Sequence, residues 1–202
     1  MPDERRQIDS DEPVWNINGE RVALGPLRRD LLPLYIRWRN DFWIQRSYGG
    51  ASNPATFEEQ TAWYEQMAVT TDSLWFTIYE RETERPIGVT DLFNLERDHG
   101  LAWFGMMIGV ADARGKGYAV ETTRLMLDYA FTVLNLHVVT LTVDEFNHAG
   151  YRAYEKAGFR ECGRIRGATL VAGRRYDRIV MDCLATEFES PVLRRLLEPD
   201  AQ

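Results

Sequence analysis

A short basic loop at residues 110–119 contains residue types that can bind a phosphate group. It reads Val-Ala-Asp-Ala-Arg-Gly-Lys-Gly-Tyr-Ala and precedes a segment whose apolar residues recur with a helical period. A glycine turn that opens a helix directs unpaired backbone N–H groups and the positive end of the helix dipole toward one point, where a phosphate can bind. Gly115 and Gly117 lack a Cβ, so a ligand can approach the backbone closely.

Three phosphate-loop patterns compete for this stretch, and spacing separates them. A dinucleotide-binding fingerprint, G-x-G-x-x-G/A, requires a third small residue where this chain has Val120. A Walker loop requires Lys and then Ser or Thr after its last glycine, whereas Gly117 is followed by Tyr118. The pattern R-x-x-G-x-A does match, at Arg114, Gly117 and Ala119. An ordinary glycine turn before a helix explains the loop alone equally well.

A second stretch, residues 147–159, has its own ordered spacing. It reads Asn-His-Ala-Gly-Tyr-Arg-Ala-Tyr-Glu-Lys-Ala-Gly-Phe and matches N-x-x-A-x-x-x-Y-x-K-x-G-F, with Gly150 at the usual alanine position. The two motifs, separated by one helix and one strand, resemble the two signatures of the GNAT superfamily of acyl-CoA-dependent N-acyltransferases. The resemblance covers roughly residues 20–186. It looks nearest to the branch of ribosomal-protein alanine and spermidine N-acetyltransferases, where a run like residues 128–137 is common.

The resemblance implies a fold and an activity. The expected fold is α/β (α+β), a single GNAT-type domain with a mixed central sheet of about seven strands, a splayed fourth and fifth strand pair, and flanking helices. The expected activity is transfer of an acetyl group from acetyl-CoA, as co-substrate, to a primary amine of a small molecule or a peptide N-terminus, directly in a ternary complex. A non-catalytic acyl-CoA-binding regulatory module of the same fold is the alternative.

The resemblance also implies roles for individual residues. The pyrophosphate is expected on the glycine loop, and the pantetheine arm against a free strand edge, whose N–H and C=O groups can pair with an amide-bearing chain. Tyr154 is the expected catalytic residue, a general acid at the sulfur, and Asn147 is expected to bond the pantetheine. Local interpretations stay open, with Asn147 as a plain helix N-cap and Tyr154 as a core aromatic. The expected cofactor-binding residues are Met107, Ile108, Gly109, Arg114, Gly115, Lys116, Gly117, Tyr118, Ala119 and Asn147.

The motifs do not identify a general base. Many relatives in the family have a glutamate on the fourth strand, where this chain has Trp103. Asp91, Asp144 and Glu145 are candidates by strand position, although each is equally compatible with a solvated turn, and a water chain or the acceptor's own deprotonation would also suffice. Trp103 suggests an aromatic acceptor pocket, suited to a ring, a sugar face or a cation. The aromatic segment 42–48 and the net charge of -7 favour a cationic amine.

Composition restricts the remaining function classes. A chain of 202 residues with 45% hydrophobic and 27% charged residues suits one globular domain with a sizeable core. The negative net charge argues against non-specific nucleic-acid binding, and no apolar run approaches the ~20 residues that cross a bilayer. Three scattered histidines have no metal-ligand spacing, and Cys162 and Cys183 are expected as free thiols. We therefore expect a cytoplasmic protein with no metal, membrane or nucleic-acid partner. A homodimer is common among relatives.

Local patterns predict the elements that position these residues. Asp30 and the Thr56-Phe-Glu-Glu box are expected to cap helices, and Asp128 is expected on the polar face of the helix after the glycine loop. Segment 41–53 reads as the variable acceptor-side segment or as a loop covering the core. Residues 1–13 are expected as a disordered tail, 14–187 as the catalytic domain, and 188–202 as a C-terminal tail with a short helix. Strands are expected at 20–27, 74–79, 87–93, 101–108 and 138–143, with a final hairpin at 159–169 and 174–185.

Overall fold

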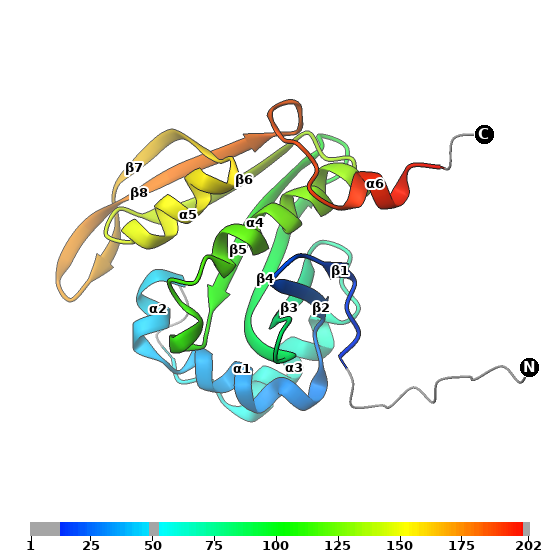
Figure 1. Ribbon diagram of the computed structural model, residues 1–202. Helices are drawn as coiled ribbons and strands as arrows, with labels where there is room; N and C mark the ends of the chain where they lie inside the picture. Colours follow the sequence, from blue (N-terminus) through cyan, green and yellow to red (C-terminus); the bar gives the residue numbers. More distant parts are fainter. Residues whose placement is uncertain (1–12, 49–52, 200–202) are drawn as a thin grey trace, which may run out of the picture.

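One eight-stranded sheet forms the centre of the computed structural model, which describes residues 13–48 and 53–199 (Figure 1). The strands lie in the order β1-β2-β3-β4-β5-β6-β8-β7. Their bounds are β1 Ile17–Asn18, β2 Val22–Pro26, β3 Leu74–Glu80, β4 Arg85–Glu96, β5 Leu101–Ile108, β6 Val138–Asp144, β7 Arg160–Val171 and β8 Arg174–Leu184. The expected seven-stranded mixed sheet gains one strand, because the two-residue β1 pairs antiparallel with β2.

The middle of the sheet opens between β5 and β6. These two strands are parallel and pair over three residue positions only, from Leu101↔Val138 to Trp103↔Thr140. The remaining half of β5 pairs with β4 alone, while β6 continues antiparallel to β8. The predicted splayed strand pair is therefore confirmed. Its strands count as fifth and sixth because β1 precedes them.

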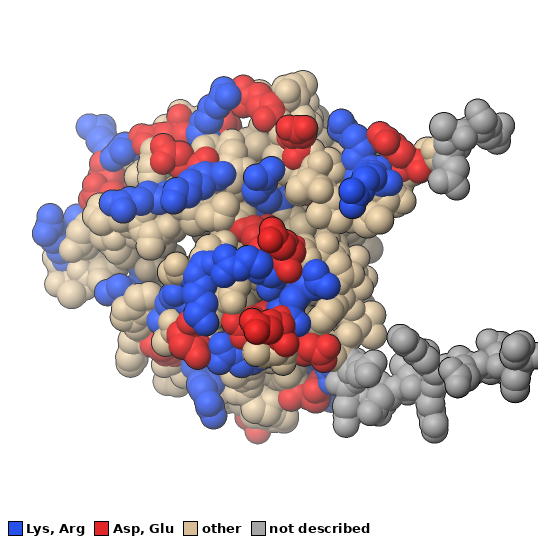
Figure 2. Space-filling view, viewed as in Figure 1, with Lys and Arg blue, Asp and Glu red and all other residues tan. Residues whose placement is uncertain are grey.

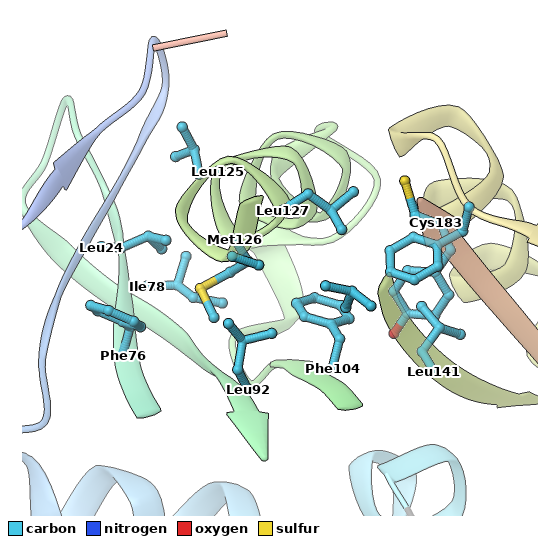
Figure 3. Packing of buried hydrophobic residues seen from close by; sticks show 14 of the residues in the cluster. Leu24, Phe76, Ile78, Leu92, Phe104, Leu125, Met126, Leu127, Leu141 and Cys183 are labelled. Atoms are coloured by element: carbon cyan, nitrogen blue, oxygen red, sulfur yellow. The ribbon is translucent and has the colours of Figure 1, made fainter. Parts of the chain in front are cut away.

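Helices cover both faces of the sheet. Their bounds are α1 Leu32–Arg39, α2 Phe42–Tyr48, α3 Phe57–Met67, α4 Tyr118–Asp128, α5 His148–Ala157 and α6 Leu193–Leu197. Figure 3 shows Met126 of α4 packed over Leu92 and Phe104 of the sheet, within the larger hydrophobic core. On the opposite face, α1 packs with Val89 and Met107 in a second buried cluster. Alternate residues of β4 and β5 thus contribute to two separate cores.

The capping predictions for α1 and α3 have different outcomes. The Thr56 Oγ1 accepts a hydrogen bond from the Glu59 N–H at 3.1 Å and so begins α3 as predicted. Asp30 does not cap α1, because its carboxylate pairs with Arg28 at 2.8 Å within a preceding 3₁₀ turn. No side-chain cap begins α1, and Pro33 occupies its first turn.

Asp128 lies in the core rather than on the polar face where the sequence period placed it. It ends α4, is fully buried, and its Oδ2 accepts hydrogen bonds from the backbone N–H groups of Val192 at 3.0 Å and Leu193 at 2.8 Å. The chain then loosens into a π-helical turn at Tyr129–Val133. The helical period placed Asp128 on the polar face because it takes no account of the C-terminal segment. The backbone N–H groups of that segment need an acceptor, and the buried Asp128 carboxylate provides it.

Segment 41–53, for which a loop covering the core was one interpretation, contains helix α2, which ends at Tyr48. Residues 49–52 lie outside the described residues. Of the predicted tails at 1–13 and 188–202, residues 1–12 and 200–202 lie outside the described residues, and the short helix expected in the second tail is α6. The predicted hairpin after the second motif is present, with Ala172 and Gly173 at its tip between β7 and β8, and it projects from the body of the molecule (Figure 1).

Candidate functional site

A cavity of about 370 Å³ opens where β5 leaves β6, and we call it the splay pocket. It is lined by α2, the last residues of β5, the glycine loop, the start of α4, and α5. All the site residues expected from the sequence line it except Gly109 and Lys116. On the molecular surface, Lys and Arg side chains gather over α5 and around the start of α4 (Figure 2). Two motifs that are far apart in the sequence thus form one pocket.

The glycine loop has backbone conformations that other residues rarely adopt. Gly115 has φ 73° and Gly117, the N-cap of α4, has φ 85°. No side chain caps α4, so its first N–H groups stay available to a ligand. A Cβ built at Gly115 would meet nothing within 4 Å, so the loop is open on its pocket side. This geometry suits an anion such as a pyrophosphate.

Basic side chains surround this helix end. Arg114, Arg152 and Lys156 line the splay pocket. The Arg114 guanidinium stacks on the Trp43 ring at 3.9 Å and donates hydrogen bonds to the carbonyl oxygens of Ile108 at 3.3 Å and Gly109 at 3.4 Å. Arg114 therefore ties the loop to the end of β5 and to α2, while its charge stays at the pocket wall.

Two of the expected cofactor residues lie elsewhere. The N–H of Gly109 donates to the Ile87 carbonyl at 2.9 Å, and a Cβ at Gly109 would lie 2.2 Å from the Trp38 ring. Gly109 is therefore required for packing against α1. The Lys116 Nζ lies 3.8 Å from Glu80, outside the pocket lining. The edge of β5 that faces the pocket consists of Met106, Met107 and Ile108.

Asn147 both caps a helix and lines the pocket, so the two interpretations are compatible. Its Oδ1 accepts a hydrogen bond from the Gly150 N–H at 3.0 Å and begins α5. A Cβ at Gly150 would lie 2.7 Å from the Asn147 Nδ2, so glycine in place of the family's usual alanine leaves space for the side-chain amide. The amide end of Asn147 thus lies at the pocket wall, two turns from Tyr154.

Tyr154 is a packed aromatic residue that also lines the splay pocket. Its ring is 9% exposed and meets Phe104 edge-to-face at 6.0 Å and Phe159 at 6.2 Å. Burial, and secondarily the charge of Asp91, raise the pKa of Tyr154 to about 12. The phenol therefore keeps its proton at neutral pH and can act as a hydrogen-bond donor in the pocket.

Asp91 is a buried carboxylate on β4 that does not line the splay pocket. It is 4% exposed, and its Oδ1 is buried with no hydrogen-bond partner among the described residues. Burial raises its pKa to about 7. Asp91 lies opposite Gly105 in the β4–β5 pairing, and a Cβ at Gly105 would lie 2.4 Å from the carboxylate. Gly105 therefore makes room for Asp91, whose charge also raises the pKa of the neighbouring Tyr48 after the larger effect of burial.

The other two candidate bases have structural partners. Asp144 accepts hydrogen bonds from Thr169 and from Arg178, the latter at 3.4 Å. Glu145 accepts one from the Asp177 N–H at 2.9 Å. Both carboxylates fasten the end of β6 to the β7–β8 hairpin.

A second cavity of about 250 Å³ lies on the other side of Tyr48, and we call it the aromatic pocket. Its walls are Tyr35 of α1, Gln45 and Tyr48 of α2, Gln60 and Trp63 of α3, and Trp75 of β3. Arg39, Val89 and Met107 complete the lining. Tyr48 and Met107 line both cavities, so the two pockets adjoin at these side chains.

The aromatic surface expected at Trp103 does not form there, because Trp103 packs against Phe93 across the β4–β5 pair at 6.4 Å and lines neither pocket. The pocket residues missed from the sequence include Gln60 and Trp63 of α3 and Trp75 of β3, which no shared motif connects. The pairing of Asp91 with Gly105 could have been found, because it follows from the hairpin register of two predicted strands.

Within residues 13–48 and 53–199, no group of three or more His, Cys, Asp or Glu side chains is placed to hold a metal ion. In the same part of the chain no helix combines the length and the apolar character needed to cross a bilayer. Cys162 and Cys183 are free.

Comparisons with known proteins agree with this geometry. The family model described as Acetyltransferase (GNAT) domain matches residues 21–160. The spermidine N(1)-acetyltransferase of Escherichia coli strain K12 is 28% identical over 191 residues, which are 90% of this chain and 97% of that protein. The crystal structure of the Vibrio cholerae spermidine N-acetyltransferase in complex with CoA and spermine has a TM-score of 0.78 and 26% identity, and covers 84% of this chain and 98% of its own. A dodecameric structure of the same Vibrio enzyme has a TM-score of 0.70 and 26% identity, over 83% and 96% of the two chains.

Proposed function

This chain belongs to the GNAT acetyltransferase family, and from that premise we propose how it moves an acetyl group from acetyl-CoA to a primary amine. N-acetyl transfer is the activity of the chain, since relatives that match nearly its whole length are N-acetyltransferases. The proposal concerns the finer assignments, namely direct transfer in a ternary complex and the residues that perform it. The observation that supports it best is the splay pocket, where an uncapped helix start and Tyr154 line one cavity.

Cofactor binding is assigned to the splay pocket. The pyrophosphate of acetyl-CoA would bind the first N–H groups of α4 and the loop of Gly115 and Gly117, with Arg152 and Lys156 as further cations. The pantetheine arm would lie along the free edge of β5 at Met107 and Ile108, where β6 no longer pairs, and would meet the Asn147 amide. Tyr118 and Ala119 provide the start of α4. This arrangement brings the thioester toward Tyr154.

The proton transfers are assigned to Asp91 and Tyr154. The amine nitrogen attacks the thioester carbonyl to form a C–N bond, and the proton of that nitrogen passes through a water chain to Asp91, which lines neither pocket. The tetrahedral intermediate then collapses with cleavage of the C–S bond, and the Tyr154 phenol donates its proton to the departing sulfur. A carboxyl pKa of about 7 is matched to a base that works near neutral pH. A non-catalytic acyl-CoA-binding module would not need an unpaired, buried carboxylate beside this phenol.

The acceptor is assigned to the adjoining aromatic pocket, which meets the splay pocket at Tyr48 and Met107. An amine entering from this side would reach the thioester while acetyl-CoA is bound, as direct transfer requires. Relatives named for spermidine acetylation make a polyamine the first acceptor to compare. The dodecameric neighbour makes oligomerisation of this chain a further expectation, which light scattering would test.

The test is release of free CoA thiol from acetyl-CoA on addition of an amine. We expect release with at least one primary amine, and calorimetric binding of acetyl-CoA to the free protein. Initial rates that fit an intersecting rather than a parallel pattern would support the ternary complex. Binding of acetyl-CoA without transfer to any member of a broad panel of polyamines, arylalkylamines, amino sugars and peptides would overturn the enzymatic proposal. Absence of acetyl-CoA binding would overturn the cofactor assignment.

A further inference from the structure

The aromatic pocket offers an unusual combination of groups to an acceptor. Trp63 meets Trp75 edge-to-face at 5.0 Å and Tyr35 edge-to-face at 6.5 Å, so three aromatic rings form one wall. Three buried polar atoms that have no hydrogen-bond partner among the described residues belong to the pocket lining: Gln45 Oε1, Gln60 Oε1 and Trp75 Nε1. All three atoms are closed to solvent in the free protein, so each reaches a ligand in the pocket only after a rotation of its side chain. Because unpaired buried polar atoms cost free energy, a ligand that bonds them after this rotation is favoured.

The charge of the pocket differs from that expected for a polycation site. Among the described residues, no carboxylate belongs to its lining, and Arg39 is the charged group there. Arg39 pairs with Glu59 at 2.7 Å, so this carboxylate, nearly half exposed, is already engaged on the outer side. Asp91, the carboxylate assigned to the reacting amine, lines neither pocket, although its charge helps to raise the pKa of Tyr48 at their junction.

These features decide between two classes of amine. A second ammonium in the pocket would lose its hydration with no counter-ion, a larger cost than one cation–π contact returns. An aromatic ring would instead gain from each edge-to-face contact beyond the burial of its surface. The volume of about 250 Å³ is below the ~300–1,000 Å³ of drug-sized sites, so the occupant is small.

We infer that the aromatic pocket selects a primary monoamine whose body is an aromatic ring with a hydrogen-bonding substituent, and that it disfavours polyamines. The ring lies among Tyr35, Trp63 and Trp75, and its substituent bonds the unpaired glutamine oxygens or the indole N–H. This inference rests on the proposed function, since it names the acceptor class of the same site. It gives this chain a specificity different from that in the names of its spermidine-acetylating relatives.

The first test compares three acceptors on the wild-type protein in the thiol-release assay. Tyramine carries the ring and a hydroxyl, phenethylamine carries the ring alone, and spermidine carries a chain of cations. We expect kcat/KM for tyramine to exceed that for phenethylamine by roughly tenfold, since a site built for a polar group penalises its absence, and spermidine to be the poorest. A kcat/KM for spermidine equal to or above that for tyramine would overturn the inference while leaving the acetyltransferase function intact.

The second test introduces the missing charge. Gln60→Glu preserves the size of a side chain that is 3% exposed and places a carboxylate in the pocket. We expect kcat/KM for spermidine to rise by roughly tenfold or more and that for tyramine to fall. The matched control is Gln66→Glu, the same change at an exposed position of the same helix outside the pocket, and it should alter neither value.

Two measurements keep the outcomes separate. Calorimetric titration with acetyl-CoA should give the same affinity for the wild-type protein and both glutamate variants, because the change is in the acceptor pocket. A folded Gln60→Glu variant that binds acetyl-CoA and leaves the amine preference unchanged would overturn the inference. If Gln60→Glu fails to fold, the wild-type comparison of tyramine with spermidine decides alone. Transfer to no amine at all would instead count against the proposed function.

Discussion

The splay pocket and the aromatic pocket adjoin at two side chains but are built in opposite ways. The splay pocket takes most of its wall from two continuous stretches, 106–120 and 147–156, and presents backbone N–H groups, glycines and a strand edge. The aromatic pocket takes two side chains from each of α1, α2 and α3 and one from β3, and presents rings and amide groups. A ligand shared across a family can be held by backbone geometry, which local spacing encodes. A ligand that varies needs side chains, which only the folded chain brings together.

The largest expected effect is at Tyr154, the residue of the splay pocket that is proposed to protonate the departing sulfur. Tyr154→Phe retains the ring contacts with Phe104 and Phe159 but removes the proton donor. We expect kcat to fall by ~10²–10⁴, the usual contribution of a general acid, with little change in acetyl-CoA affinity or Tm. Stopped-flow thiol release and calorimetry on the same preparation check this. A nearly normal kcat would leave Tyr154 as a packing residue of the splay pocket.

The next effect is at Asp91, whose pKa links chemistry to pH. Because this pKa is about 7, the fraction of ionised base, and with it kcat/KM, should rise with pH and level off above about 7. Asp91→Asn should lower kcat by ~10², near the lower end of the range for a general base, since water can replace part of its role. In this variant, the pH dependence of kcat/KM should then follow the ionisation of the acceptor amine alone.

Stability provides an independent check on Asp91. Its pKa is raised from 3.8 to about 7 on folding, so the native state binds this proton more tightly than the unfolded chain does. The stability contribution of the protonated form is therefore complete below about pH 4 and is lost as the pH rises to about 7. Asp91→Asn should raise Tm near pH 8 and change it less near pH 5. A lower Tm near pH 8 would mean that Asp91 has an unseen partner.

A smaller effect is expected from a methyl group on the glycine loop. Gly115→Ala should raise the Kd for acetyl-CoA by roughly tenfold, because the Cβ would project into the open side of the loop. Gly173→Ala at the β7–β8 tip is the matched control, since φ is 80° there against 73° and neither Cβ would meet an atom within 4 Å. Both should lose a similar ~1–2 kcal/mol of stability through the left-handed backbone. Equal acetyl-CoA affinity in the two variants would contradict the assignment of the pyrophosphate to this loop.

The smallest effect belongs to the aromatic pocket. Trp63→Leu removes a ring that meets Tyr35 and Trp75 and should raise the acceptor KM by roughly three- to tenfold, in line with one lost aromatic contact. The Kd for acetyl-CoA should not change. Product inhibition patterns and calorimetry separate the two ligands. If Trp63→Leu weakened the binding of acetyl-CoA as much as the binding of the acceptor, the two pockets would not act independently.

The contrast between the pockets also explains what the sequence could predict. The loop at Gly115 and Gly117 and the Asn147 cap follow from local spacing, whereas the splay of β5 was implied by the family resemblance. The structure contains all three features. Gly109 was predicted to bind the cofactor but lies outside the splay pocket, because Trp38, from a helix distant in the sequence, occupies the space beside it. Trp103 lines neither pocket, since strand alternation turns it toward Phe93.

Charge was the hardest property to predict. Asp91, Asp144 and Glu145 have similar sequence contexts, and their partners separate them. Thr169 and Arg178 reach Asp144 from the hairpin, whereas Asp91 lies against a glycine and keeps an unpaired oxygen. The desolvation that raises the pKa of a carboxyl group depends on packing from all sides, and no local sequence pattern encodes that packing.

The buried end of α4 has a consequence for synthesis of the chain. Asp128 Oδ1 accepts a hydrogen bond from the nearby Thr132 hydroxyl at 2.8 Å, but its Oδ2 finds backbone donors only at Val192 and Leu193, more than sixty positions later. A nascent chain that has finished both acetyl-CoA motifs therefore still holds an unsatisfied carboxylate oxygen at the end of its central helix. Translation that stops shortly before Ser190 should therefore yield a product with both motifs that cellular proteases recognise as unfinished.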